Sequence, residues 1–206
     1  MNLYLIRHAR QNSPLCNVNV ELSSKGIRQA KLLAQRLENY SFEKIYSSDL
    51  LRAVQTAEII NTKHLKHQIY SELQEIDFGL LTGNTDEENN IRFKDFLAQR
   101  KELSEDLAFP GGECGRDVFL RAMPILDKIV SQEIEGAVIV THGGTIRSLL
   151  AGILGMTQAK KLLLGVTLEN SSITQLSYNK KNHRYTLERF NDAAHLEKYP
   201  ELQRNY

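Results

Sequence analysis

Residues 138–144 read "VIVTHGG" and residues 5–9 read "LIRHA", so two apolar runs each end at a histidine. Continuous apolar runs of this length, bounded by polar residues or glycine, are typical of strands buried on both faces. They predict one strand over residues 2–7 and another over 137–141. Because strands buried on both faces occur in parallel sheets covered by helices, the two runs indicate an α/β fold.

The rest of the chain alternates between helical and strand patterns. Ser23 or Ser24 offers an N-cap ahead of apolar residues at helical spacing over 27–37, and Asp49 offers one after the strand pattern at 44–48. The remaining patterns predict a strand at 68–70, helices at 50–60, 87–101, 113–132 and 145–154, and a hairpin of 172–178 with 184–190. This alternation predicts an α/β sandwich with a mostly parallel sheet, and we expect a single domain over residues 1–206.

The composition excludes several classes of partner. The 206 residues are 41% apolar and 25% charged, and the net charge of +1 favours neither a nucleic-acid partner nor a membrane surface. Two cysteines, Cys16 and Cys114, are too few for a disulfide scaffold. The first apolar run is too short for a signal peptide or a membrane span. We therefore expect a cytoplasmic protein with reduced thiols.

Both predicted strands carry polar side chains to the same edge of the sheet. Ligands of open α/β sheets bind beyond the carboxyl ends of the strands, where Arg7, His8 and His142 are expected to meet. Gly143 and Gly144 remove side-chain bulk at the start of the next helix, so backbone N–H groups there could approach an anion. The sequence therefore predicts an anion site at this edge.

Two further residues fit such a site. Arg52 lies in the first turn of the helix after the second strand, and its planar guanidinium suits phosphate oxygens. Glu75, in the loop after the third strand, is a candidate proton carrier if burial favours its neutral form. Taken singly, each of these side chains is more often structural or solvent-exposed. Their combination predicts a pocket for a dianion.

Several motifs in the chain resemble those of one family. The motifs follow each other over residues 3–155, and they read "YLIRHA" (4–9), "LSSKGIRQA" (22–30), "YSSDLLRAVQTAEII" (46–60), "LQEIDFGLLTG" (73–83), "FPGGEC" (109–114) and "VIVTHGGTIR" (138–147). In this order they resemble the histidine phosphatase superfamily, the phosphoglycerate mutase-like proteins. The short length and "FNDAAHL" (190–196) resemble the α-ribazole phosphatases and broad-specificity sugar-phosphate phosphatases within it.

The resemblance implies a three-layer α/β/α sandwich and a role for each residue of the predicted site. His8 corresponds to the nucleophile that becomes phosphohistidine, and Glu75 to the acid/base. The phosphate ligands it implies are Arg7, Arg52, a protonated His142 and the backbone of Gly143. No metal or cofactor is implied, and the histidines show no H-E-x-x-H or cysteine-rich spacing; His64 and His67, among lysines, indicate a solvated face.

The chain departs from the family pattern near the first histidine. Ala9 replaces the usual glycine, Arg10 and Gln11 replace other polar residues, and Pro14 stands where asparagine is usual. Cys114 replaces the serine after Gly-Gly-Glu. These departures change the loop that would contact the substrate and leave every charged group of the predicted site in place.

Three functions remain open from the sequence. The first is a phosphomonoester hydrolase acting on a small phosphorylated metabolite, such as α-ribazole phosphate or a sugar phosphate. The second is a phosphoglycerate mutase, which in this family has a long basic insertion before the Gly-Gly-Glu segment. The corresponding stretch here, residues 84–109, is short and its cations are offset by acidic residues, which favours hydrolysis. The third is a catalytically inactive phosphate-binding protein.

Overall fold

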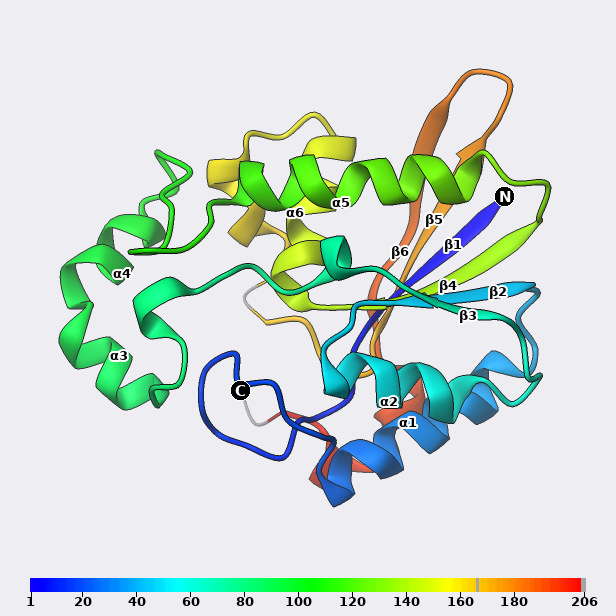
Figure 1. Ribbon diagram of the computed structural model, residues 1–206, viewed down its shortest axis with the longest axis horizontal. Helices are drawn as coiled ribbons and strands as arrows, with labels where there is room; N and C mark the ends of the chain where they lie inside the picture. The colour runs from blue at the N-terminus through cyan, green and yellow to red at the C-terminus, as the bar shows by residue number, and fades with distance from the viewer. Residues whose placement is uncertain (166, 205–206) are drawn as a thin grey trace.

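A computed structural model describes residues 1–165 and 167–204 of the chain. Their strands form one mixed sheet with helices around it (Figure 1). The strand order is β3-β2-β4-β1-β5-β6. The first four strands in this order run parallel to one another, whereas β5 and β6 pair antiparallel at one side. The strands are β1 (Asn2–Arg7), β2 (Lys44–Ser47), β3 (His67–Ile69), β4 (Gly136–Thr141), β5 (Ile173–Asn179) and β6 (Arg184–Asp192).

Helices cover both faces of the sheet, as the sequence predicts. In Figure 1, α5 (Gly115–Val130) and α6 (Gly143–Ile153) lie above it, and α1 (Ser24–Leu37) and α2 (Leu51–Ile60) lie below. The short helices α3 (Asp86–Arg92) and α4 (Lys94–Lys101) extend to one side of the sheet. The described residues also form the 3-10 turns η1 (Ser71–Leu73), η2 (Gly79–Leu81), η3 (Gln158–Leu163), η4 (Ala194–Leu196) and η5 (Pro200–Leu202).

The core is divided into two layers by the alternation of side chains along the strands. In β1, Leu3 and Leu5 pack in the cluster that contains residues of α5 and α6. Tyr4 and Ile6 pack in the cluster that contains residues of α1 and α2. Because successive strand residues point to opposite faces, a continuous apolar run is needed to fill both layers. The three-layer α/β/α fold expected from the sequence is therefore confirmed.

The structure differs from the sequence-based expectations at three places. Asp49 does not cap α2, which has Leu50 at its N-cap position, and the Asp49 carboxylate accepts a hydrogen bond from Gln74 instead (2.7 Å). The helical stretch predicted at 87–101 is two helices, because the backbone at Phe93 leaves the helical region (φ −116°, ψ 28°). His67 is half-buried in β3 and hydrogen-bonds with Ser47, rather than lying on a solvated face (2.8 Å).

In the part of the chain that the structure describes, no helix has the length and apolar character that crossing a membrane requires.

Candidate active site

The parallel strands β1 and β4 bring the two predicted histidines together. Arg7 pairs in register with Thr141, so the residues that follow, His8 and His142, leave the sheet side by side. Their ring centroids are 5.0 Å apart. Both side chains are almost completely buried, with 5% and 0% of their surface exposed. The convergence that the sequence predicts at the carboxyl edge is therefore present.

The imidazole of His8 is held as a neutral ring with a defined tautomer. Its Nδ1 lies 2.7 Å from the carbonyl oxygen of Ala9, which can only accept, so Nδ1 carries the proton. Its Nε2 accepts a hydrogen bond from Nε of Arg52 (3.2 Å) and therefore has a lone pair. Burial, followed by the charges of Arg52 and Arg7, holds the pKa of His8 well below its usual range.

Arg52 is among the largest fully buried side chains of the described residues, with 1% of its surface exposed. It comes from the first turn of α2, and the loop after β1 fixes its guanidinium. Nη1 donates to the carbonyl of Val18 (2.9 Å) and Nη2 donates to Oδ1 of Asn17 (2.8 Å). Burial lowers the pKa of Arg52, yet a guanidinium keeps its charge in proteins. A fixed cation therefore lies against the Nε2 atom of His8.

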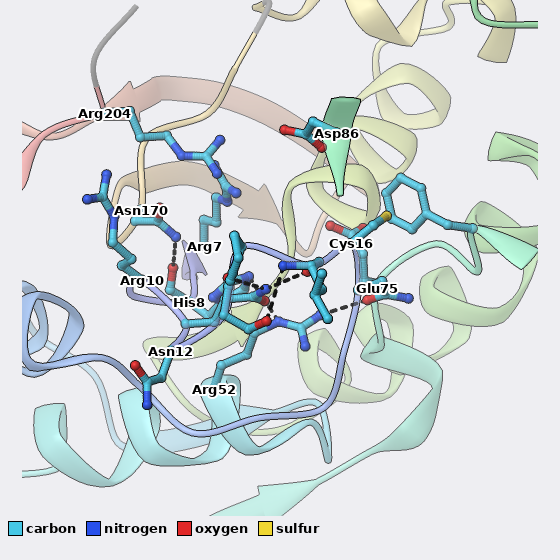
Figure 2. A pocket seen from close by; sticks show the side chains of 16 residues that line it. Arg7, His8, Arg10, Asn12, Cys16, Arg52, Glu75, Asp86, Asn170 and Arg204 are labelled. Carbon is cyan, nitrogen blue, oxygen red and sulfur yellow. Dashed lines mark hydrogen bonds between the residues drawn. The ribbon is translucent and has the colours of Figure 1, made fainter. Parts of the chain in front are cut away.

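A cavity of about 630 Å³ opens above these residues (Figure 2). Arg10, Asn170 and Arg204 lie on one side of it in this view, and Glu75 lies on the other. Arg7 extends from the end of β1 into its wall and donates from Nη1 to the carbonyl of Leu168. Burial, followed by the charge of Arg204, lowers the pKa of Arg7 to about 9, so Arg7 stays protonated at neutral pH.

His142 lies at the N-cap position of α6 and contacts a residue that the sequence analysis did not single out. Its Nε2 is 2.7 Å from Oγ of Ser48, the residue directly after β2. Burial, followed by the charges of His8 and Arg52, holds the pKa of His142 well below its usual range. The ring is therefore neutral here, and the imidazolium expected from the sequence would need the charge of a bound dianion to raise that pKa.

The Glu75 carboxylate lies at the N-terminus of α6. It accepts hydrogen bonds from the backbone N–H groups of Ile76 (2.9 Å), Gly144 (3.2 Å) and Thr145 (3.3 Å). A helix N-terminus leaves its first N–H groups without helical partners, and a carboxylate is stabilised there. Part of the anion-binding end of α6 that the sequence predicts is therefore occupied by a side chain of the protein.

The two glycines after His142 have different surroundings. A Cβ atom on Gly144 would lie 2.4 Å from Oε1 of Glu75 and 2.8 Å from Ile76, so no side chain fits while Glu75 holds its place. A Cβ atom on Gly143 would meet nothing closer than Arg7 and Arg147 at 3.7 Å. The protein itself therefore requires glycine at position 144, whereas the space beside Gly143 faces the guanidinium of Arg7.

A guanidinium from α5 holds the loop that carries Glu75. Arg121 donates to three backbone carbonyls of this loop, those of Glu72 (2.6 Å), Gln74 (3.0 Å) and Glu75 (3.0 Å). It also forms a two-bond ion pair with Glu113, at 2.7 and 2.8 Å. Glu113 in turn accepts from the backbone N–H of Asp77 (2.9 Å). The "FPGGEC" segment thus meets the Glu75 loop through Glu113, a contact that the motif alone does not reveal.

Sequence reasoning missed several residues that line or support the cavity. Ser48 follows a buried strand and could have been found by the rule that identified His8 and His142. Asn170, which donates to the His8 carbonyl (2.9 Å), and Arg204 come from distant segments without such a signal. Cys16 also lines the cavity, where burial raises its pKa to about 11 and keeps the thiol protonated.

The described residues contain no group of three or more His, Cys, Asp or Glu side chains that could hold a metal ion. What they do bring together is a neutral imidazole, buried guanidinium groups and a carboxylate at the carboxyl edge of a parallel sheet. In an α/β protein, such an arrangement can bind a tetrahedral anion next to an imidazole nitrogen that has a lone pair.

The chain belongs to the histidine phosphatase superfamily (branch 1), whose sequence model matches residues 3–193. Phosphoserine phosphatase 1 of Hydrogenobacter thermophilus is 28% identical over 95% of this chain and 94% of its own length. Phosphoglycerate mutase-like protein 4 of Arabidopsis thaliana is 31% identical over 92% of this chain and 82% of its own length.

Solved structures agree with this assignment. The mycobacterial glucosyl-3-phosphoglycerate phosphatase in complex with inorganic phosphate is similar with a TM-score of 0.83 and 30% identity, over 94% of this chain and 98% of that one. The matching structures also include the α-ribazole phosphatase of Shigella flexneri, with a TM-score of 0.78 and 25% identity over 94% of this chain and 97% of that one. The family resemblance stated from the sequence is therefore confirmed.

Proposed function

We propose that this protein hydrolyses phosphomonoesters of small metabolites in two steps, through a phosphohistidine formed on His8. The observation that carries the proposal is the neutral His8 ring, whose Nδ1 proton is bound by Ala9 and whose Nε2 lone pair lies 3.2 Å from the Arg52 guanidinium. An imidazole must be unprotonated to attack phosphorus, and a neighbouring cation draws the phosphoryl group to it.

In the first step Nε2 of His8 attacks the phosphorus atom and the bond from phosphorus to the leaving oxygen breaks. Before this attack, as the substrate binds, Arg52 moves its Nε–H from His8 to a phosphoryl oxygen, which frees the Nε2 lone pair. Arg7, His142 and the backbone N–H of Gly143 bind the other phosphoryl oxygens and balance their charge. These protein groups thereby neutralise the phosphoryl group, as metal ions do in many other phosphoryl-transfer enzymes. In the free protein Glu75 is a carboxylate that accepts backbone N–H groups, so it first takes up a proton from the incoming phosphomonoester monoanion or from solvent, and it then gives this proton to the leaving alkoxide.

In the second step water replaces the alcohol. Glu75, now ionised, takes a proton from the water while its oxygen attacks phosphorus, and the bond from phosphorus to Nε2 breaks. Inorganic phosphate leaves, His8 returns to its neutral form and Glu75 is again protonated. The clamp of Arg121 on the Glu75 loop supports this role, because an acid/base must stay within reach of one oxygen through both steps.

Hydrolysis is favoured over mutase activity by the surroundings of the cavity. A mutase must keep water from its phosphohistidine until the phosphoryl group is returned to a substrate. Within residues 84–109, α3 contributes Asp86 to the lining of the cavity of about 630 Å³, whereas Arg100 and Phe109 line only the smaller space on the far side of Glu75. A segment this short leaves the cavity over His8 accessible to water, so the phosphoenzyme can be hydrolysed.

The names of the relatives support a substrate class. The relatives named above act, by their names, on phosphoserine and glucosyl-3-phosphoglycerate, and others on α-ribazole phosphate. We propose a small phosphorylated metabolite of this kind, either a sugar phosphate or α-ribazole phosphate, as the substrate.

The test is phosphate release from p-nitrophenyl phosphate, sugar phosphates and α-ribazole phosphate, combined with rapid quenching to trap the phosphoenzyme. We expect turnover and an acid-labile, base-stable phosphoryl group in the wild type, and neither in His8→Ala. His183→Ala is the matched control, because His183 is exposed in the turn between β5 and β6. Retention of most activity in His8→Ala would exclude this nucleophile. Interconversion of phosphoglycerates without phosphate release would establish a mutase, and phosphate binding without turnover an inactive binder.

A further inference from the structure

The motif "FNDAAHL" (190–196) near the end of the chain takes no direct part in the proposed reaction. It ends β6 and forms η4, and none of its residues, all of which the structure describes, lines the cavity of about 630 Å³. Two of its side chains, those of Asn191 and His195, instead bind residues 169–171. Any effect of this motif on the reaction must therefore pass through that segment.

Residues 169–172 lie directly beside the end of β1 that carries the nucleophile. All four are polar, and each has at most 4% of its surface exposed. Nδ2 of Asn170 donates to the carbonyl of His8 (2.9 Å, Figure 2). The backbone N–H of Ser171 donates to the carbonyls of Arg7 (2.9 Å) and His8 (3.3 Å). This segment therefore fixes the orientation of the His8 carbonyl.

The orientation of that carbonyl determines where the reactive nitrogen points. The same peptide group joins His8 to Ala9, whose N–H donates to Oγ1 of Thr56 (3.0 Å) and whose carbonyl binds Nδ1 of the His8 ring (2.7 Å). A rotation of this peptide would displace the partner of Nδ1 and turn Nε2 away from its line of attack. A misplacement of about 1 Å can cost about 100-fold in rate, because the reacting atoms must be aligned.

Asn191 holds the start of this segment from a bulge in β6. The pairing of β5 with β6 leaves residues 190 and 191 opposite the single residue Thr174. Asn191 has a left-handed backbone (φ 50°), which asparagine tolerates better than most residues, and its Oδ1 accepts a hydrogen bond from the backbone N–H of Glu169 (2.7 Å). Because a bulge redirects a side chain, this one aims the Asn191 amide at the segment beside His8.

His195 holds the middle of the segment through Ser171. Its Nδ1 lies 3.5 Å from Nη1 of Arg36, which can only donate, so Nε2 carries the proton and donates to Oγ of Ser171 (3.0 Å). Arg36 is itself held by an ion pair with Asp192 of the same motif. Burial, followed by the charge of Arg36, lowers the pKa of His195 to about 4, so the ring is neutral at pH 7. Ser171 has a left-handed backbone (φ 59°), a conformation that depends on the contacts around it.

We propose that Asn191 and His195 are positioning residues for the nucleophile, and that they hold residues 169–171 where these bind the His8 carbonyl and aim the His8 ring at phosphorus. The inference rests on the proposed phosphohistidine reaction and adds to it two residues that do not touch the substrate.

The first experiment is rapid quenching of the wild type, His195→Leu and His195→Gln with p-nitrophenyl phosphate. Leucine removes the hydrogen bond to Ser171 in a similar volume, whereas the glutamine amide keeps an N–H donor. We expect the rate constant of phosphohistidine formation to fall about tenfold in His195→Leu and to stay within about threefold of the wild type in His195→Gln, with KM changing less than kcat. The fraction of protein that becomes phosphorylated should not change. A smaller fraction with an unchanged rate constant would show a purely structural role and overturn the inference.

Two further variants test the position of the effect. Asn191→Gly allows the left-handed backbone and removes only the side-chain amide, so it should lower the same rate constant. His183→Leu is the matched control, because His183 also contacts a hydroxyl, that of Tyr178 (2.9 Å), but lies in the turn between β5 and β6. It should leave the rate constant unchanged, and equal effects of His183→Leu and His195→Leu would contradict the proposed positioning.

Spectroscopy separates this inference from the proposed function. If the wild type forms no phosphohistidine, the proposed function is refuted, and the Nδ1–H resonance of His8 decides the inference alone. We expect this resonance to shift in His195→Leu and not in His183→Leu. An unchanged resonance in His195→Leu would show that His195 does not position His8.

Discussion

Lowering the pH from 7 to 5 should destabilise this protein, and a defined part of the loss should come from His8. In the folded chain burial and the neighbouring guanidinium groups hold the pKa of His8 well below its usual range, whereas in the unfolded chain it returns to about 6.5. Below pH 6.5 the unfolded state therefore binds one proton more than the folded state at this residue. Stability rises with pH when the unfolded state binds more protons, so it must fall as the pH is lowered.

The size of the effect follows from the same two states. Each pH unit below the unfolded pKa costs about 1.4 kcal/mol per histidine that stays neutral in the fold. Between pH 7 and pH 5 this amounts to about 2 kcal/mol for His8. His142 contributes in the same direction, as does His195, whose pKa burial lowers to about 4. A single histidine is therefore isolated by comparing the wild type with a variant that lacks it.

The assay is urea unfolding of the wild type and His8→Gln at pH 7, 6 and 5, in buffers without phosphate, since an anion bound to the folded state would add its own stabilisation. The wild type should lose about 2 kcal/mol more than His8→Gln over this range. Nitrogen-15 spectra should also show the proton on Nδ1 and none on Nε2 at pH 6. If both proteins lose the same free energy within about 0.5 kcal/mol, His8 is not a neutral buried ring and the argument for the nucleophile fails.

Three further outcomes are expected. Arg121→Lys should lower kcat about tenfold or more with a smaller change in KM, because the hydrogen bonds of the guanidinium to the Glu75 carbonyl and to Glu113 are lost. Unchanged steady-state kinetics would show that Arg121 does not position the acid. Gly144→Ala should lower the free energy of unfolding in urea by about 1–3 kcal/mol and reduce turnover. Gly143→Ala should change the free energy of unfolding by less than about 1 kcal/mol, and a larger effect at Gly143 than at Gly144 would contradict the packing described. Initial rates in excess EDTA should equal those without it, and a loss restored by a divalent cation would reveal a metal requirement.

The sheet and its helices were predictable because their signal is local. The two buried strands that His8 and His142 follow, β1 and β4, are continuous apolar runs in the sequence. The helices between these strands are recognised by apolar residues at helical spacing. The errors arose where tertiary contacts compete with local preference, as they do at helix ends and at His67, which hydrogen-bonds with Ser47. Asp49 has the side chain of a helix cap but pairs with Gln74, and Phe93 separates two helices that the pattern joins.

The sequence by itself determined that Arg7, His8 and His142 would meet, because residues following parallel strands emerge at one edge whatever the details of packing. Only the tertiary structure decided the protonation states and the orientations of these side chains. The lone pair on Nε2 of His8 beside Arg52, the carboxylate of Glu75 at the start of α6 and the position of Arg204 in the cavity wall depend on contacts between segments far apart in the chain. Such contacts leave no periodic pattern, since they are set by the packing of the whole molecule.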